Sequence, residues 1–235
     1  LSSGGQYALT DCGSGSSWYN AGQTAVYRLR SLGTRTLDYL ILTHYDSDHV
    51  NGAAAVLERM DVGVLLAPED AEDAELRRTI LDAAAAHGTE VRPLTEETEL
   101  PLGKAQLTVY PPVGEGEDND RGLAVLASLG DQNLLITGDM DAATERRLIA
   151  AYDLPGLGYL VAGHHGSRYS TSDDLLDALT PETALISVGS NSYGHPAEET
   201  LRRLAEHGCA VYRTDLHGTI HLSIWQGERN EEQEQ

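Results

Sequence analysis

The sequence predicts an α/β protein built as an αββα sandwich, in which two mixed sheets pack together between outer layers of helices. The apolar runs LDYLIL at 37–42 and VGVLLA at 62–67 are typical of strands that are buried on both faces. Segments with helical spacing alternate with such runs, which indicates parallel strands joined by helices. Between about 98 and 137 strand-like segments instead follow one another through turns, which indicates antiparallel pairing there.

In the first part of the chain, strands and helices are expected in alternation. A turn at Gly4 and Gly5 precedes the first strand, Gly33 and Gly88 end two of the helices, and Asn51 is the expected N-cap of another. The expected elements are strand 6–11, helix 24–33, strand 37–43, helix 52–60, strand 62–67 and helix 69–87.

The second part begins with strands joined by turns, including a hairpin turn at Gly130 and Asp131, and then returns to alternation. The expected elements are strands within 98–112, 122–130 and 132–139, helix 141–151, strand 157–163, helix 172–179, strand 183–189, helix 197–207, strand 209–215 and a last strand 218–225. Because no repeat or linker interrupts this pattern, we expect residues 1–226 to form one domain and residues 227–235 to form an acidic, solvated tail.

Acidic residues dominate the composition: the 235 residues include 37 Asp and Glu but 16 Lys and Arg, for a net charge of -21. This charge argues against a protein that holds nucleic acid on a broad basic surface. No apolar run reaches the roughly 18 residues of a membrane-spanning helix, and no signal peptide is visible. The chain begins without Met in a hairpin-like segment, so we expect a fragment of a longer protein. Cys12 and Cys209 are either buried small apolar residues or a disulfide pair.

Polar side chains with ligating or catalytic chemistry follow directly after the predicted strands. In α/β layers such positions meet at one edge, where loops present functional groups on a rigid scaffold. A single Asp or His at a strand end is usually a turn, cap or core residue, so the grouping is what indicates function. The residues in these positions are Asp11, His44, Asp46, Asp48, His49, Asp139, His164, His165 and, after a short loop, His195.

The densest group is HYDSDH, which begins at His44. Two histidines and two aspartates this close repel or compete for protons unless a cation gathers them, so the segment predicts a metal site. His44 and Asp46 are spaced to hold one ion, and Asp48 and His49 to reach a second. Asp139 is the natural bridging carboxylate, and the histidine pair of AGHHGS offers a further ligand. Two such ions activate water and stabilise the attacking and leaving oxygens of a displacement.

THYDSDHVNG resembles the H-x-H-x-D-H signature of the metallo-β-lactamase superfamily, with Asp46 in place of the second His. With ITGDM, GHHGS, SVGSNSYGHP and YRTDLHGTI in that order, it is similar to the C-terminal nuclease-like domain of ComEC-type competence DNA-uptake proteins. The similarity covers residues 7–224, and five motifs at matching spacing are specific for this group. It implies the αββα metallo-β-lactamase fold, a dinuclear metal site, and hydrolysis of phosphodiester bonds in the DNA strand that is not imported.

The resemblance also assigns roles to single residues. The metal ligands that it implies are His44, Asp46, Asp48, His49, Asp139 and one or both of His164 and His165. Asp48 and His195 are the expected catalytic residues, because His195 falls where the family places a residue near the scissile phosphate. The residues expected behind the ligands or at the substrate are Asp11, Ser167 and Arg168.

Three features depart from the family's pattern. The upstream strand with its Gly-Gln-Gly element is missing, which favours a truncated fragment. The additional histidine of site one, expected between His49 and Asp139, has no clear match, since His87 lies on a predicted helix. The Asn-x-x-Ser element aligns with Asn119 to Gly122, where the Ser is absent. We therefore expect site one to be weak or completed by water.

The ligand set and the resemblance together give the expected cofactors and partners. Asp46 makes site one richer in oxygen, which favours Mn²⁺ over Zn²⁺ for the two divalent ions. The resemblance implies single-stranded DNA as the substrate, and the membrane channel and DNA-binding domains of the same full-length protein as partners. It places this domain at the cell membrane, on the extracytoplasmic side, without insertion of this chain into the bilayer.

Two other functions stay open. The same dinuclear site can serve hydrolysis of a small lactone or phosphodiester, and an acidic rim suits a cationic or neutral substrate. A degenerate domain that binds one metal or none and acts as a partner module is favoured by the missing histidine of site one. The intact HYDSDH, GD and HHGS motifs count against a degenerate domain.

Overall fold

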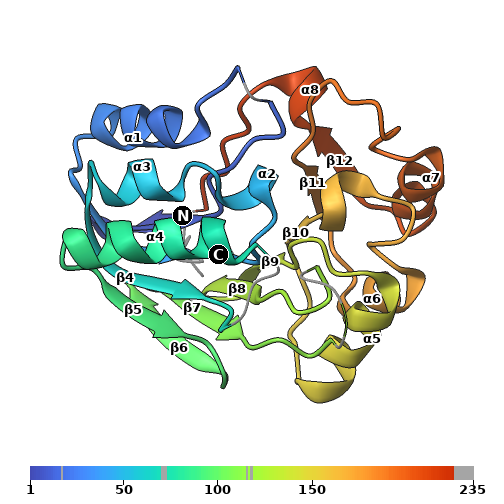
Figure 1. The fold of residues 1–235 in the computed structure, drawn as a ribbon. Coiled ribbons are helices and arrows are strands. Elements are labelled where there is room, and N and C mark those ends of the chain that lie inside the picture. The colour runs from blue at the N-terminus through green and yellow to red at the C-terminus, as the bar shows by residue number, and fades with distance from the viewer. Residues whose placement is uncertain (17, 70–72, 115, 117–118, 225–235) are drawn as a thin grey trace, which may run out of the picture.

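A computed structural model describes residues 1–235 apart from 17, 70–72, 115, 117–118 and 225–235. Two sheets pack face to face, with helices on the outer side of each (Figure 1). One sheet has the strand order β1-β2-β3-β4-β5 and the other β12-β11-β10-β9-β8-β7-β6. This arrangement confirms the αββα sandwich of mixed sheets. The acidic tail expected at 227–235 lies outside the described residues.

The five-stranded sheet and its helices come from the first part of the chain. Strands β2 to β5 are parallel, and β1 pairs antiparallel with β2 through the turn at Gly4 and Gly5, which both have positive φ. The elements are β1 Ser2–Ser3, β2 Gln6–Thr10, α1 Ala21–Ser31, β3 Thr36–Ile41, α2 Ser47–Val50, α3 Ala53–Leu57, β4 Asp61–Ala67, α4 Ala74–Ala86 and β5 Glu90–Pro93.

The seven-stranded sheet comes from the rest of the chain. Strands β6 to β9 pair antiparallel in sequence order, with the expected hairpin turn at Gly130, and β9 to β12 are parallel. The elements are β6 Thr98–Leu102, β7 Ala105–Tyr110, β8 Ala124–Leu129, β9 Gln132–Ile136, α5 Ala142–Ala151, β10 Tyr159–Val161, the 3-10 turn η1 Gly163–Gly166, α6 Asp173–Leu179, β11 Thr183–Ile186, α7 Glu198–Glu206, β12 Ala210–Arg213 and α8 Thr214–His217.

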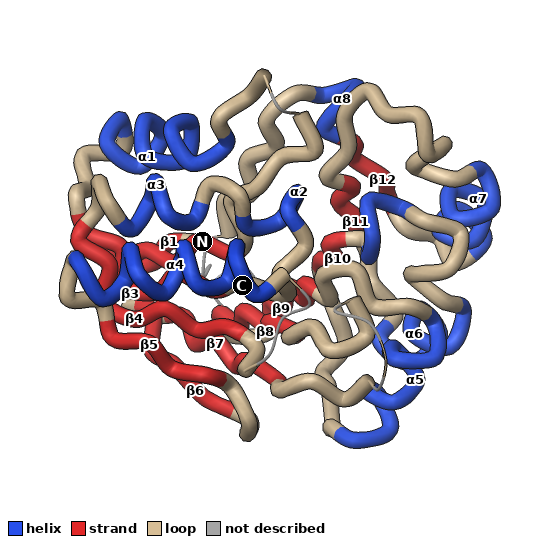
Figure 2. Tube along the Cα trace, viewed as in Figure 1, coloured by secondary structure: helices blue, strands red, loops and turns tan. Residues whose placement is uncertain are grey.

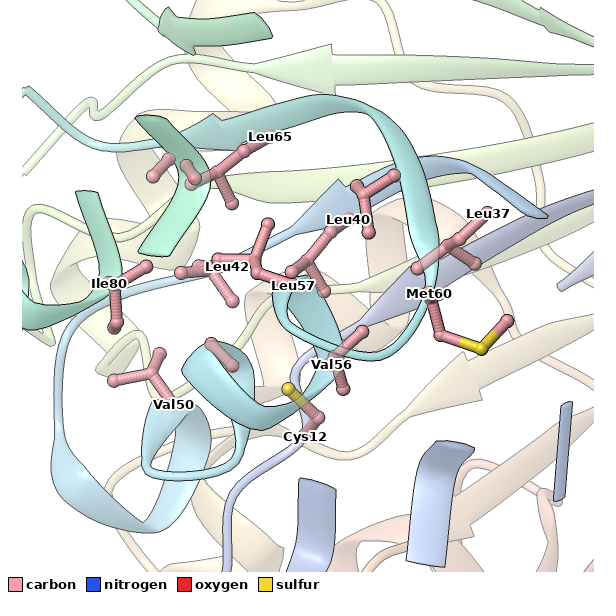
Figure 3. Close-up of a cluster of buried hydrophobic side chains, with 14 of the residues drawn as sticks. Cys12, Leu37, Leu40, Leu42, Val50, Val56, Leu57, Met60, Leu65 and Ile80 are labelled. Atoms are coloured by element: carbon pink, nitrogen blue, oxygen red, sulfur yellow. The ribbon is translucent and has the colours of Figure 1, made fainter. Parts of the chain in front are cut away.

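Three apolar cores separate the four layers. Neighbouring residues of β3 face opposite ways, because Leu40 packs under the outer helices and Ile41 packs between the sheets. Figure 3 shows the first outer core, where Leu40 and Leu65 lie with Leu57 of α3 and Ile80 of α4. Burial on both faces explains why these strands are apolar throughout, and each such side chain contributes about 1.5–3 kcal/mol.

Asn51 is not the N-cap of α3, as the sequence suggested. It is the C-cap of α2, and α3 begins after Gly52. Its amide instead holds the loop that follows β2: Nδ2 donates to the Ser14 carbonyl at 2.7 Å and Oδ1 accepts the Ser14 N–H at 3.1 Å. A tertiary contact therefore uses the side chain that a local cap would have used.

Several more elements differ from expectation. Strand β5 and the short helices α2 and α8 were not predicted, and α8 begins within the expected strand 209–215. The helix expected from 69 begins at Ala74, after Asp73, whose side chain accepts two N–H groups of its first turn. The strand expected at 218–225 is not formed by its described part, 218–224. There Ile220 and Leu222 line a cavity beside α1 and β9 rather than pairing in a sheet.

Cys12 and Cys209 are both free and buried, each in a different outer core. The structure thus favours the interpretation of small buried apolar residues. Among the described residues the longest helix is α4 with 13 residues, and none has the length and apolar character needed to cross a bilayer.

Candidate metal centre

The candidate site lies where the carboxyl ends of parallel strands from both sheets meet. Helix α2 follows β3 and lies between the helices of the first part and strands β10 and β11 (Figure 2). Beside α2 is a cavity of about 280 Å³. The predicted site residues that line it are Asp11, Asp48, His49, Asp139, His164 and His165.

Asp11 organises the first part of the site from a left-handed backbone position, φ 52°. Its Oδ1 accepts the Thr43 N–H at 2.8 Å. Its Oδ2 accepts the Thr43 hydroxyl at 2.7 Å and lies 2.8 Å from His49 Nδ1. One carboxylate therefore fixes both the residue before His44 and the ring of His49. This is the geometry of an orienting residue, and that role of Asp11 stays a prediction.

The hydrogen bonds around His44 leave its Nε2 as a lone pair. The Thr43 hydroxyl donates its only hydrogen to Asp11, so it must accept the one on His44 Nδ1, 2.9 Å away. His44 is 1% exposed, and burial, with His49 nearby, lowers its pKa to about 4. Within the described part of the chain its Nε2 has no hydrogen-bond partner. A buried lone pair without a donor is costly unless a cation takes that place.

His49 is held by the same carboxylate of Asp11. With Nδ1 donating to Asp11, its buried Nε2 faces Asp139 Oδ1 at 3.2 Å, without hydrogen-bond geometry to any described residue. Burial acts to lower the pKa of His49, but the carboxylates of Asp11 and Asp139 raise it to about 11. The same histidine holds the pKa of Asp139 well below its usual range, against the effect of burial. This pocket thus stabilises positive charge, and a metal ion can replace the proton.

A second group forms around Asp48 and His165. The Nδ1 of His165 donates to the Ser187 carbonyl at 2.7 Å, and its Nε2 lies 3.6 Å from Asp48 Oδ2. The pairing with Asp48 raises the pKa of His165, and His165 in turn lowers the pKa of Asp48. The ring of His165 lies 5.1 Å from that of His49, so the two groups are continuous.

The residues fit divalent metal ions. The ligand atoms of His44, His49 and Asp139, and those of Asp48, His49 and His165, lie within 4.8 Å of one another in each group. Nitrogen-to-carboxylate distances across both groups run from 3.2 to 4.0 Å. Atoms bound to one ion at about 2.0–2.2 Å stand about 3.0–3.6 Å apart, so little movement closes the groups around an ion. Each ring is fixed through Nδ1 and presents Nε2, as metal-ligating histidines do.

Asp46 and His164 complete the predicted set at the edge of the first group. Asp46 Oδ2 lies 3.8 Å from His44 Nε2, and its side chain is 47% exposed. His164 Nε2 lies 3.6 Å from Asp139 Oδ2. His164 and His165 therefore each face one carboxylate of the cluster, and only His165 belongs to one of the two compact groups.

Residues 119–122 lie beside His44, where the family has a further element. Leu123 donates its N–H to the Thr43 carbonyl at 2.7 Å, and a Cβ added to Gly122 would lie 3.8 Å from His44 Cβ. Asn119 Oδ1 is buried and has no hydrogen-bond partner among the described residues. A Cβ at 122 would also come within 3.2 Å of the Asn119 carbonyl oxygen and 3.3 Å of the Thr43 carbonyl oxygen, so the glycine lets this segment pass close to the ring-bearing strand end, and an incomplete site one stays a prediction.

The two histidine-bearing segments differ in construction. We call residues 43–49 the ring-anchored segment and residues 163–172 the backbone-anchored loop. In the loop, His164 and His165 have φ of 49° and 53°, values that cost about 1–3 kcal/mol for side chains of this kind. Glu145, which is fully buried, accepts the N–H groups of Thr171 at 2.6 Å and Ser172 at 2.8 Å.

Arg203 of α7 holds the same loop from the other side. Its Nη1 donates to the carbonyls of Ser170 and Thr171, each at 2.9 Å. The sequence did not single out Arg203, Glu145 or Thr43. A charged residue inside an ordinary helix gives no pattern of its own, and only the position of Thr43 directly before His44 hinted at a role.

His195 lies on the loop after β11, at the outer side of the histidine pair. Its ring centroid is 5.6 Å from that of His164. Burial, helped by His164 and His165, lowers its pKa, so the imidazole is neutral near pH 7. The structure brings His195 next to the metal-ligand groups, as a residue near a substrate would lie.

Ser167 and Arg168 occupy the middle of the backbone-anchored loop. Ser167 is 2% exposed, and its hydroxyl accepts the Tyr169 N–H at 3.3 Å, so it shapes the loop from within. The Arg168 guanidinium is 57% exposed and lies 3.6 Å from Glu199, and its charge helps to lower the pKa of His195. Arg168 is thus the better placed of the two for a contact with an anionic substrate.

Known proteins share both the family pattern and the fold. The family model of the metallo-beta-lactamase superfamily matches residues 1–190. ComE operon protein 3 of Bacillus subtilis (strain 168) is 31% identical over 195 residues, 82% of this chain and 25% of that protein. Competence protein ComA of Neisseria gonorrhoeae is 33% identical over 217 residues, 88% of this chain and 28% of that protein. The chain spans about a quarter of the length of these relatives.

Solved structures agree on the architecture. Zn(2+)-bound PqqB from Methylobacterium extorquens aligns over 88% of this chain and 81% of its own, with a TM-score of 0.55 and 11% identity. The metallo-beta-lactamase fold protein YhfI from Bacillus subtilis aligns over 88% and 84%, with a TM-score of 0.55 and 12% identity. At this identity the likeness concerns the fold alone. The resemblance to the superfamily and to competence proteins that the motifs indicated is confirmed.

Proposed function

The chain belongs to the metallo-beta-lactamase superfamily, a fold of metal-dependent hydrolases, and from this premise we propose that it is a metal-dependent nuclease that hydrolyses phosphodiester bonds of DNA. The observation that carries the proposal is the pair of buried histidine Nε2 atoms, on His44 and His49, that face Asp139 without any described hydrogen-bond partner. One relative is named a competence protein, and on this likeness we propose that the chain degrades the non-imported strand during DNA uptake.

The proposed ligands are the seven residues of the two groups and their edge. They are His44, Asp46, Asp48, His49, Asp139, His164 and His165. When bound, divalent ions supply Lewis-acid activation of water and stabilisation of charge on the phosphoryl oxygens. Three carboxylates in this set favour Mn²⁺, with Zn²⁺ as the second choice.

The protein's own part in the reaction is positioning and proton transfer. Asp11 holds His49 directly and His44 through Thr43, so these rings need no reorientation when substrate arrives. Asp48, 42% exposed and with a lowered pKa, presents an ionised carboxylate to the cavity. The neutral ring of His195 would donate an N–H hydrogen bond to a phosphate oxygen; to protonate the leaving alkoxide it would first have to take up a proton and act as the imidazolium.

The full-length protein around this domain is part of the proposal. Since the chain spans about a quarter of its relatives, we infer that a membrane channel and DNA-binding segments accompany it in the same polypeptide, with this domain on the extracytoplasmic side. Such partners would also compensate for the net charge of -21, which does not by itself attract a polyanion.

The test is cleavage of single-stranded DNA by protein loaded with Mn²⁺ or Zn²⁺, together with its metal content. Asp48→Ala is expected to reduce cleavage by more than about 100-fold with little change in thermal unfolding. Asp131→Ala, in the β8–β9 hairpin turn at the amino end of β9 and so at the far end of the strands from the site, is the matched control and should cleave normally. Only trace metal after loading, or normal cleavage by Asp48→Ala, would show that the activity is not that of this site.

A small substrate is the second candidate. The cavity of about 280 Å³ lies just below the usual size range of ligand pockets, which suits a phosphate group or a small ester. Comparing turnover of single-stranded DNA with that of a small phosphodiester and a lactone separates the two functions. Protein that binds metal and hydrolyses none of the three substrates would instead be a partner module.

A further inference from the structure

To bind a nucleic-acid strand, this site needs contacts other than electrostatic attraction to the phosphate backbone. The cavity of about 280 Å³ is lined by the carboxylates and imidazoles of the metal-ligand groups, so the phosphate of a strand, and not its bases, is the part that these groups would take. The net charge of -21 gives no broad basic surface to hold the backbone. Proteins that bind single strands also stack bases on aromatic side chains, and this contact does not depend on net charge.

An exposed tyrosine stands at the outer end of a series of rings that leads out of the site. The ring of His164, whose Nε2 lies 3.6 Å from Asp139, is 5.6 Å from that of His195. The ring of His195 is stacked with that of Tyr193 at 6.1 Å and an interplanar angle of 20°. Tyr193 is 82% exposed, so its far side is open to solvent beside the candidate catalytic histidine.

The loop that carries Tyr193 is built to hold it still. The Asn191 side chain makes five hydrogen bonds within it: Nδ2 donates to the carbonyls of Gly189 and His195, and Oδ1 accepts the N–H groups of Tyr193, Gly194 and His195. The Asn191 side chain thus fixes the backbone on both sides of Tyr193. A loop that is already ordered loses less conformational entropy when a base stacks on the ring.

We propose that Tyr193 is a base-stacking platform for a single-stranded nucleic acid, taking the base next to the phosphate that lies at the metal-ligand groups. The inference rests on the proposed nuclease function and specifies its substrate class. Bases in a duplex are already stacked on one another, whereas those of a single strand are free to lie on the ring. The platform therefore selects single strands over duplexes.

The test compares variants on matched oligonucleotides. Tyr193→Ala is expected to lower kcat/KM for single-stranded DNA about tenfold, from the usual contribution of one stacked base. Tyr193→Phe keeps the ring and should recover most of that loss. Tyr27→Ala, which removes an exposed tyrosine from α1, is the control. A single abasic position scanned along the strand should reduce wild-type cleavage at one position next to the cut, and Tyr193→Ala should be insensitive to it.

A binding measurement separates this inference from the nuclease proposal. An oligonucleotide with 2-aminopurine at that position should lose fluorescence on binding wild type and Tyr193→Phe, but not Tyr193→Ala. Absence of cleavage by wild type would overturn the nuclease function, and the fluorescence would still report stacking. The platform is overturned if Tyr193→Ala matches wild type in cleavage or fluorescence, or if it slows an abasic strand as much as an intact one.

Discussion

The ring-anchored segment at 43–49 and the backbone-anchored loop at 163–172 supply histidines to one site by opposite means. In the segment, His44 and His49 are 1% and 7% exposed, and Asp11 holds the ring of His49 directly and that of His44 through the Thr43 hydroxyl. In the loop, the side chains of His164 and His165 are 35% and 28% exposed on a left-handed backbone. The segment is therefore suited to hold ions out of water, and the loop to meet substrate as well.

The difference follows from where each segment finds its support. The ring-anchored segment leaves a buried strand, so polar groups around it must pair with one another. The backbone-anchored loop lies between α5 and α7, whose charged residues Glu145 and Arg203 bond its backbone and leave its side chains free. Variants that remove one support at a time can show whether the ring-anchored segment and the backbone-anchored loop contribute separately to metal binding, cleavage and stability.

Asp139→Asn is expected to have the largest effect, because Asp139 lies between the two parts, 3.2 Å from His49 and 3.6 Å from His164. An amide lacks the charge that a bridging ligand contributes. Metal affinity and DNA cleavage should each fall by more than about 100-fold, beyond the 10–100-fold typical of residues behind the ligands. Metal content after dialysis and initial cleavage rates measure this. Metal retained at wild-type level would show that the two parts do not share this carboxylate.

Asp11→Asn removes the support of the ring-anchored segment alone. The amide can no longer accept hydrogen bonds at both oxygens from Thr43 and His49, so metal affinity should fall about 10- to 100-fold. Asp38→Asn is the matched control, since Asp38 also ties β2 to β3, through Gln6 and Tyr7, but away from the site. It should keep wild-type affinity. Equal losses of affinity in the two variants, by metal titration, would reduce Asp11 to a structural residue.

The sequence predicts the ring-anchored segment better than the backbone-anchored loop. Ligands of the ring-anchored segment are contiguous, so HYDSDH indicated a metal site directly, and Asp11 followed from its place after a strand. The supports of the loop come from Glu145 and Arg203, which lie far away in the chain on ordinary helices. Their contacts are to backbone groups and leave no pattern of residue types. The same cause explains Asn51, which bonds Ser14 across the fold instead of capping α3.

Glu145→Gln tests the backbone-anchored loop and is expected to have the smallest effect on metal. Both carboxylate oxygens accept backbone N–H groups, from Thr171 and Ser172, and an amide can accept at one only. The unfolding free energy should therefore fall by about 1–3 kcal/mol, with metal affinity reduced less than in Asp11→Asn. Glu206→Gln, on the exposed face of α7, is the control and should change stability by less than about 0.5 kcal/mol.

The difference in stability between wild type and Glu145→Gln should also depend on pH, and the pKa of Glu145 predicts in which direction. Burial raises the pKa of Glu145 above its usual 4.5, although the hydrogen bonds from Ser172 and Thr171 act against it. A raised pKa means that the folded state favours the protonated acid, so this stabilisation is complete below about pH 4.5 and is lost as the pH rises through the folded-state pKa. Chemical denaturation of chelator-treated protein should then show the stability deficit of Glu145→Gln shrinking from acidic to neutral pH. A deficit that grows over this range would mean that Glu145 holds the loop as a carboxylate favoured by its bonds, and that the loop, like the ring-anchored segment, depends on a buried charge.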